Sequence, residues 1–311
     1  MKRSVHGVVA GLLVIIGYLG VQPRAEASLG ALYYTLAIGN TIDGVDYDAN
    51  DILKYDTVSG ATSLFFDASS LFPPTSINNS YHDNHDRIDA LYIFPNGDFL
   101  LSTDKNTSIG SLNFQKNDLV RVDPVTKAAS IFLDGATTFQ GVQDVQAVDV
   151  LDNGKLVIAA DGGKIGTNEL EFGPRDLVLY DPVSGNAALF FNGDDHFEGK
   201  QGAIAAVDVL PDGQLLLAVR DDVDALIGGG IHVDRKDIFL YNPVTKHAEI
   251  VLDGRDNYFQ RTSHEHDQGF ASVFVPPSDT PPVVPEPVTS SLFGIGLLGA
   301  SVFSRRKRFV A

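Results

Sequence analysis

Short runs of alternating apolar and polar residues recur through residues 31–275, and most of them end in a turn signal. One ten-residue pattern occurs four times, with spacings of 67, 58 and 61 residues between copies. The copies are Asp51–Gly60, Asp118–Lys127, Asp176–Gly185 and Asp237–Lys246. In each copy an apolar run leads into a turn of the Asp-Pro-Val-Ser-Gly type, and a second apolar run follows the copy. The pattern predicts one β-hairpin in each copy.

A second hairpin is predicted between the copies, because apolar runs flank Pro95-Asn96-Gly97, Asp152-Asn153-Gly154 and Pro211-Asp212-Gly213. Two hairpins give four strands in about 60 residues, which is typical of one blade of a β-propeller with a long loop. The run 270–275 lacks a partner strand, and the run 31–37 supplies one from the other end of the chain. The sequence therefore predicts an all-β body over residues 28–276, a four-bladed β-propeller closed by its N- and C-terminal strands.

Within each repeat of about 60 residues, a turn of the Asp-Gly type comes before a turn of the Asp-Pro type. This order resembles the blades of NHL and gluconolactonase-type propellers. The resemblance covers single blades and not the whole ring. Two alternatives stay open, namely half of a larger ring completed by dimerisation and a pair of stacked sheets.

Both ends of the chain have the pattern of export signals. Lys2 and Arg3 precede an apolar run from Val8 to Gly20, and Ala25-Glu26-Ala27 follows it. A basic start, a short apolar run and small residues before the cut predict a secretory signal peptide over residues 1–27. The alternative is an N-terminal membrane anchor, although the run is shorter than the ~20 residues of a membrane span.

The C-terminal segment has three parts in a fixed order. A Pro-rich linker over residues 277–287 ends in Val284, Pro285, Glu286 and Pro287; residues 288–303 carry no charge; and Arg305, Arg306, Lys307 and Arg308 follow. The uncharged run predicts a single transmembrane helix within residues 288–311, with the basic cluster on the cytoplasmic side. The segment resembles the PEP-CTERM sorting signal, which implies processing by an exosortase during export. A plain tail anchor is the alternative.

Net charge and residue usage exclude several classes of function. The chain has no Cys, which excludes thiol catalysis, thiolate metal sites and disulfides. Residues 28–284 hold 16 basic and 38 acidic residues, so the body repels phosphate backbones and no nucleic-acid partner is expected. A hydrophobic content of 44% is sufficient for a packed core.

Two predicted loops on the same face of the ring are rich in metal-ligating side chains. They contribute His82, His85 and Asp86 from one loop and His264, His266 and Asp267 from the other. Imidazole and carboxylate groups are ligands for Zn²⁺, and clustered Asp residues in other loops suit Ca²⁺. Two solvated polar loops are the alternative interpretation, so neither ion is assigned as a cofactor.

The repeated positions are expected to be structural. Asp51, Asp118, Asp176 and Asp237 open a strand in every copy, whereas a single active site requires a position at which the copies differ. Tyr47, Phe114, Phe172 and Val233 are expected in the core, and Ala90, Ala147, Ala206 and Ala271 at the crowded ring centre. Any site is expected among the long loops at residues 39–50, 68–87, 104–117, 135–144, 161–175, 193–203, 220–236 and 254–268.

The sequence favours an exported protein of the cell envelope or exopolysaccharide matrix with a binding or structural role. Its expected partners are the exosortase, the export machinery, exopolysaccharide and surface proteins, and the membrane before processing. No catalytic residue is assigned. The alternative function is a lactonase-like, metal-dependent hydrolase in which Asp86 or Glu265 assists a metal-bound water.

Overall fold

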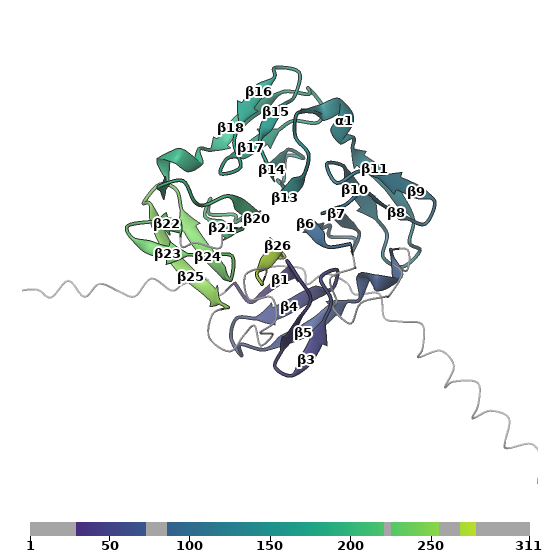
Figure 1. The fold of residues 1–311 in the computed structure, drawn as a ribbon, viewed down its shortest axis with the longest axis horizontal. Helices are drawn as coiled ribbons and strands as arrows, with labels where there is room; N and C mark the ends of the chain where they lie inside the picture. Colours follow the sequence, from purple (N-terminus) through teal and green to yellow (C-terminus); the bar gives the residue numbers. More distant parts are fainter. Residues whose placement is uncertain (1–28, 73–85, 221–224, 255–267, 278–311) are drawn as a thin grey trace, which may run out of the picture.

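The computed structural model describes residues 29–72, 86–220, 225–254 and 268–277, and these are nearly all β. Four antiparallel sheets of four strands each surround a common centre (Figure 1). The all-β prediction is therefore confirmed. The predicted signal peptide, the sorting motif, the basic cluster and the predicted transmembrane segment lie outside the described residues. Within the ranges that are described, no helix is long and apolar enough to cross a membrane.

Each large sheet is named here after its innermost strand. The β26 sheet has β26 (Phe270–Phe274), β1 (Ala31–Leu36), β4 (Ile52–Asp56) and β5 (Thr62–Phe66). The β6 sheet has β6 (Ile88–Ile93), β7 (Phe99–Thr103), β10 (Leu119–Val122) and β11 (Ala129–Leu133). The β13 sheet has β13 (Val145–Val150), β14 (Leu156–Ala160), β17 (Leu177–Tyr180) and β18 (Ala187–Phe191). The β20 sheet has β20 (Ile204–Val209), β21 (Leu215–Val219), β24 (Asp237–Asn242) and β25 (His247–Asp253).

Four of the predicted long loops contain short antiparallel hairpins, so the prediction of four strands per unit was incomplete. The hairpins are β2 (Asn40–Ile42) with β3 (Val45–Tyr47), β8 (Thr107–Ile109) with β9 (Leu112–Phe114), β15 (Gly163–Ile165) with β16 (Leu170–Phe172), and β22 (Ala225–Ile227) with β23 (Ile231–Val233). β12 (Phe139–Gln140) joins β15, and β19 (Phe197–Glu198) joins β22. The remaining elements are α1 (Gly135–Thr138) and the 3-10 turns Ala68–Ser70 and Gly193–Asp195.

These hairpins escape sequence analysis because each arm is only three residues long. Each hairpin nevertheless anchors itself with two apolar side chains that are buried against the large sheets. Ile42, Ile109, Ile165 and Ile227 come from the first arms, and Tyr47, Phe114, Phe172 and Val233 from the second. The prediction that the second set belongs to the core is confirmed.

The hydrophobic core consists of four clusters, one between each pair of neighbouring sheets. Strands near the centre are covered on both faces, which is why β14 and β21 are continuous apolar runs. The same strand therefore contributes to two clusters, because successive side chains point to opposite faces. In β1, for example, Tyr33 packs in the cluster shared with the β6 sheet, and Tyr34 packs in the cluster shared with the β20 sheet.

The two ends of the described chain meet in one sheet. β1 pairs with β26, and Tyr34 lies directly opposite Val273, as the sequence predicted. Among the inner strands, β6 lies beside β13, β13 beside β20, β20 beside β26 and β26 beside β6 (Figure 1). The short turns, such as residues 94–98, follow the inner strands, and the long connections precede them. We call these the short-turn end and the long-loop end of the centre.

The register corrects one prediction about the crowded centre. Ala90, Ala147 and Ala206 occupy equivalent positions, since each lies just after an extra residue in its strand. In β26 that position belongs to Ser272, which lies opposite Thr35, and not to Ala271. In β26 the alanine is itself the extra residue, so matching alanine to alanine placed this strand one residue out of register.

Candidate functional site

The residues predicted to bind metal are largely outside the described part of the chain. This applies to His82, His85, His264, His266 and Asp267. Asp86 is described; it is buried, and its carboxylate accepts a hydrogen bond from the Thr107 hydroxyl. Among the residues that the structure covers, no group of three or more His, Cys, Asp or Glu side chains is placed to hold a metal ion. The predicted metal site therefore stays a prediction.

Each inner strand carries one extra residue near the long-loop end. The pairing of β6 with β7 passes from Ile88–Thr103 to Ala90–Ser102, which leaves Asp89 without a partner position. The same shift leaves Gln146 extra in β13, Ala205 in β20 and Ala271 in β26. A β-bulge redirects the side chain of its extra residue, and bulges are common beside functional sites. The four copies thus differ in side chain at a position that they share in backbone.

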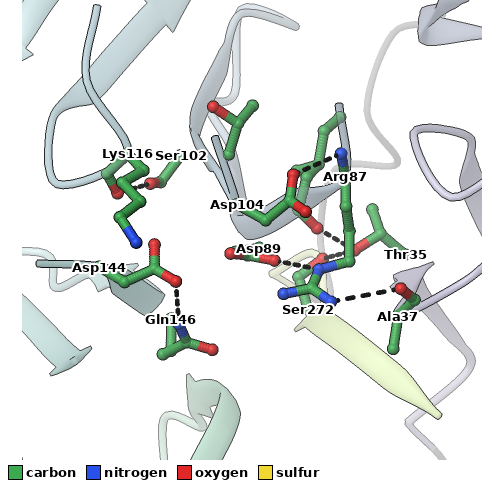
Figure 2. A network of polar contacts seen from close by, with 12 residues as sticks. Thr35, Ala37, Arg87, Asp89, Ser102, Asp104, Lys116, Asp144, Gln146 and Ser272 are labelled. Atoms are coloured by element: carbon green, nitrogen blue, oxygen red, sulfur yellow. Dashed lines mark hydrogen bonds and ion pairs between the residues drawn. The ribbon is translucent and has the colours of Figure 1, made fainter. Parts of the chain in front are cut away.

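Asp89 forms an ion pair with Arg87, the residue just before β6. The Arg87 Nε atom lies 2.5 Å from Asp89 Oδ1, and a second guanidinium nitrogen donates to the Ala37 carbonyl at 3.3 Å (Figure 2). Asp104 fixes the backbone at this point by accepting from the Arg87 N–H at 3.0 Å. Asp89 is 1% exposed, and its Oδ2 atom accepts no hydrogen bond within the described ranges. Burial raises the pKa of Asp89 to about 6, against the opposing effect of Arg87.

Asp144 approaches the same point from the next sheet. Its Oδ2 atom accepts from Gln146 Nε2 at 2.6 Å, whereas its buried Oδ1 atom has no hydrogen-bond donor among the described residues. Burial raises the pKa of Asp144 to about 7; the negative charge of Asp89 adds to the shift, and Lys116 opposes it. Figure 2 shows the Asp89 and Asp144 carboxylates on facing sides of the centre, with Lys116 beside Asp144.

Backbone contacts between neighbouring sheets hold these side chains in place. The Lys116 carbonyl accepts from the Ser102 hydroxyl at 2.9 Å and from the Val145 N–H at 3.2 Å, which ties the loop before β10 to the start of β13. On the other side, the Thr35 hydroxyl donates to the Ile88 carbonyl at 2.8 Å and lies 2.7 Å from the Ser272 hydroxyl. The long-loop end is therefore preorganised by the strands themselves.

We name this group the axial cluster: Arg87, Asp89, Asp104, Lys116, Asp144 and Gln146. It offers two hydrogen-bond acceptors without donors, together with guanidinium, ammonium and amide donors. Such a set suits a polar ligand with several hydrogen-bonding groups. Sequence analysis missed the cluster because its residues come from separate repeats and follow no motif. The difference between copies at the bulge position marks the cluster once the register of the inner strands is known.

The repeated aspartates are structural, as predicted. Asp51, Asp118, Asp176 and Asp237 each accept a backbone N–H from the residue three positions earlier, at 2.8–2.9 Å. Asp118 and Asp176 also accept from Gly135 and Gly193, which follow the outer strands. One carboxylate thereby joins the start of the third strand of a sheet, β10 or β17, to the connection that follows the outermost strand of the same sheet.

The short-turn end carries a second pair of buried carboxylates. Asp149 accepts from Val209 N at 3.0 Å, and Asp208 accepts from Val275 N at 3.2 Å, so each links its inner strand to the next one. Burial raises the pKa of Asp149 to about 6, and burial together with the charge of Asp149 raises the pKa of Asp208 well above its ordinary value. The equivalent positions in β6 and β26 are Tyr92 and Phe274, whose rings meet edge to face at 5.2 Å.

Comparison with known proteins identifies no family. No family model matches the chain, and no curated protein matches it. Solved structures with some likeness include the extracellular domain of a one component system from B. thetaiotaomicron, with 10% identity over 72% of this chain and 36% of that chain and a TM-score of 0.35. An auxiliary nutrient binding protein from Bacteroides thetaiotaomicron has 12% identity over 73% and 50% of the two chains, with a TM-score of 0.31.

A streptogramin B lyase has 12% identity over 75% of this chain and 76% of that chain, with a TM-score of 0.33. The present chain spans about a third to a half of the length of the two proteins from Bacteroides. At these identities and TM-scores the likeness assigns no activity to the chain.

Proposed function

We propose that the chain is an exported binding protein, a closed four-bladed β-propeller that holds a glycan of the cell envelope or exopolysaccharide matrix at its long-loop end. One observation carries the proposal. Asp89 Oδ2 is a buried acceptor without a donor in the described structure, at a position where the other copies have Gln146, Ala205 and Ala271. A buried polar atom without a partner costs free energy, so a ligand that donates to it gains binding energy.

The closed ring is supported by the contacts of the terminal strands. β26 pairs with β1 and also lies beside both β6 and β20, so the four inner strands follow one another around the centre without a gap. A closed ring places the four bulge positions around one point, and a ligand there contacts side chains from several blades. An open array would separate Asp89 from Ser272 and remove the Thr35–Ser272 contact.

Export is supported by the sequence alone. The proposed route uses the signal peptide over residues 1–27 and the tripartite segment with Val284–Pro287 and Arg305–Arg308, which an exosortase would process. Mass spectrometry of the native protein tests this route. We expect a mature N-terminus at Ser28 and a new C-terminus near Glu286; an uncut chain would contradict the proposal.

Binding is favoured over catalysis by the groups in the axial cluster. Its carboxylates already accept from Arg87 and Gln146, and each presents one further acceptor oxygen. Planar amide, carboxylate and guanidinium groups together match the hydroxyl groups of a sugar, which both donate and accept. The lactonase-like hydrolase depends on His82, His85, His264 and His266, which the structure does not describe, and it stays the alternative.

A glycan array tests the proposed function with the mature protein. The array holds neutral, acidic and amino oligosaccharides, and Asp144→Asn is compared with Asp152→Asn. Asp152 lies in the exposed short turn after β13, so its substitution changes net charge equally but leaves the long-loop end intact. We expect at least one oligosaccharide class to bind and Asp144→Asn to weaken that binding about tenfold, which is ~1.4 kcal/mol. Failure of every class to bind would overturn the proposal.

A further inference from the structure

Two buried acceptor atoms from different sheets belong to the axial cluster, and their carboxylates lie on facing sides of the centre (Figure 2). Asp89 Oδ2 comes from β6, and Asp144 Oδ1 comes from the residue just before β13. The other oxygen of each carboxylate is already used, by Arg87 and by Gln146 respectively. Asp89 is almost completely buried, so bulk solvent does not reach its second oxygen. Each carboxylate therefore has one oxygen left to accept a hydrogen bond from a ligand.

We infer that the group held between Asp89 and Asp144 is a primary ammonium of the ligand. This inference rests on the proposed binding function and specifies the chemistry of the ligand at that site. The ammonium has three N–H donors on one small centre, which allows it to contact both carboxylates at once. Its positive charge also offsets the repulsion between the two acidic side chains.

The charges around the cluster favour a cation over a neutral hydroxyl. Asp89 is faced by Arg87, Asp104 and Arg220, and Asp144 is faced by Asp89, Lys116, Arg87 and Asp161. Asp89 is paired with Arg87, and Asp104 lies 3.9 Å from Lys105 Nζ, so Asp144 is the carboxylate of the axial cluster for which the described residues provide no ion pair. A neutral hydroxyl would donate to one oxygen and leave the repulsion unchanged. A charge-assisted hydrogen bond is about twice as strong as a neutral one.

A metal ion fits the same two oxygens less well. Ca²⁺ takes six to eight oxygen ligands and Zn²⁺ takes four ligands in a tetrahedron. Among the described residues the axial cluster has two acceptors without donors, and no triad of metal-ligating side chains occurs. An ammonium needs only the acceptors that are present.

A primary ammonium has two sources at a cell surface, and the same experiment separates them. One source is a deacetylated hexosamine unit of a glycan, and the other is the side chain of a lysine in a peptide. Isothermal titration calorimetry of the mature protein at pH 7.5 compares three ligands. These are a glucosamine tetramer, its fully N-acetylated counterpart and a lysine-containing tetrapeptide, each tested with wild type, Asp144→Asn and Asp152→Asn.

We expect the glucosamine tetramer to bind at least tenfold more tightly than the N-acetylated tetramer. Asp144→Asn should abolish this preference, because it removes one of the two charges, and Asp152→Asn should keep it. Any binding of the lysine tetrapeptide, whose ammonium keeps its charge throughout, should weaken as the pH falls from 7.5 to 5.5, since protonation of Asp144 removes one of the two negative charges.

The outcomes distinguish this inference from the proposed function. Equal binding of the two tetramers, reduced by Asp144→Asn, would overturn the ammonium inference and keep the glycan-binding function. Preference for the lysine peptide over both tetramers, lost in Asp144→Asn, would support the ammonium and overturn the glycan as its source. Binding by none of the three ligands would overturn the ammonium inference, and the glycan array then decides the function.

Discussion

The two ends of the centre contain the same chemical groups but differ in how those groups are satisfied. At the short-turn end, Asp149 and Asp208 are buried, and both accept backbone N–H groups from the neighbouring inner strand. At the long-loop end, Asp89 and Asp144 each keep one buried oxygen for which the described residues provide no donor. All four carboxylates have raised pKa values.

A raised pKa therefore does not by itself distinguish a binding site from a structural link. Burial raises the pKa in both places, because it disfavours the charged form. Hydrogen bonding separates them: the short-turn carboxylates connect one sheet to the next, while the long-loop carboxylates have acceptor capacity left for a ligand. The two ends are also packed differently, since aromatic rings fill the short-turn end and polar side chains occupy the long-loop end.

The largest expected effect is on the packing of the short-turn end. Phe274 is 2% exposed, and its ring contacts Tyr92 and Tyr33. Phe274→Ala should lower the free energy of unfolding by about 3–5 kcal/mol, because it opens a cavity between the β26 and β6 sheets. Urea unfolding measures the loss. Ligand affinity below the denaturation range should stay unchanged, and a tenfold loss of affinity would show that the two ends are coupled.

The next largest effect is expected from Asp89 itself. Asp89→Ala leaves the Arg87 guanidinium without its carboxylate partner and should reduce stability by about 2–3 kcal/mol. The double variant Arg87→Met plus Asp89→Leu should recover most of that loss, because it leaves no charge unpaired. Urea unfolding of the three proteins gives the comparison. If the double variant is less stable than Asp89→Ala, the charges have a structural role that the ion pair does not explain.

The pH dependence of stability should reflect both ends together. A carboxylate whose pKa is raised in the folded state binds more protons there than in the unfolded chain, so its contribution to stability falls as the pH rises through its folded-state pKa. For Asp89 and Asp149, near 6, and Asp144, near 7, stability should decrease between about pH 5 and pH 8. Calorimetry should show a melting temperature that is lower at pH 8 than at pH 5 by on the order of 5 °C.

Asp208→Asn sharpens this test at one end only. The amide oxygen of the variant still accepts from Val275 N–H, but it carries no charge to desolvate. The decrease in melting temperature between pH 5 and pH 8 should therefore become smaller, with ligand affinity unchanged. Below about pH 4 the trend reverses, because Asp56, Asp123 and Asp181 have lowered pKa values and lose their favourable hydrogen bonding on protonation. An unchanged slope would mean that Asp208 binds no more protons in the folded protein than in the unfolded chain over this pH range, and hence that its pKa is not raised.

The smallest effect concerns the turns of the short-turn end. The same turn position has φ values of 71°, 59°, 71° and 54° in Gly60, Lys127, Gly185 and Lys246, a region that favours glycine. Lys127→Gly should stabilise the protein by about 0.5 kcal/mol, since relief of strain exceeds the loss of one exposed hydrogen bond from Lys127 to the Ser70 carbonyl. Thermal unfolding provides the measurement, and Gly60→Lys is the matched reverse change, which should destabilise the protein.

Much of the fold follows from local patterns that sequence analysis reads directly. The β6–β7, β13–β14 and β20–β21 hairpins lie where alternating runs and Gly-containing turns predict them. The pairing of β1 with β26 was also predicted, because one end of the chain lacks the strand that the other end provides. The small hairpins between the larger ones were missed, since three-residue arms are too short to show a period.

The candidate site could not be predicted in the same way. The His and carboxylate clusters that the sequence shows lie close together in the chain, whereas Asp89 and Asp144 belong to different repeats. In the sequence, Asp144 has no feature that distinguishes it from the other loop aspartates, and Asp89 has none that distinguishes it from other polar residues in strands. Their common location depends on the extra residue in each inner strand, and this residue cannot be identified until the register with the next strand is known.

The sequence by itself determined the repeated hairpins, the apolar strands and the joining of the chain ends, because periodicity and turn chemistry act over a few residues. Tertiary structure alone decided which carboxylates face each other and which find a backbone donor. The physical reason is that hydrogen-bond satisfaction at the centre depends on neighbouring sheets, and each sheet supplies the N–H groups and side chains that its own repeat does not contain.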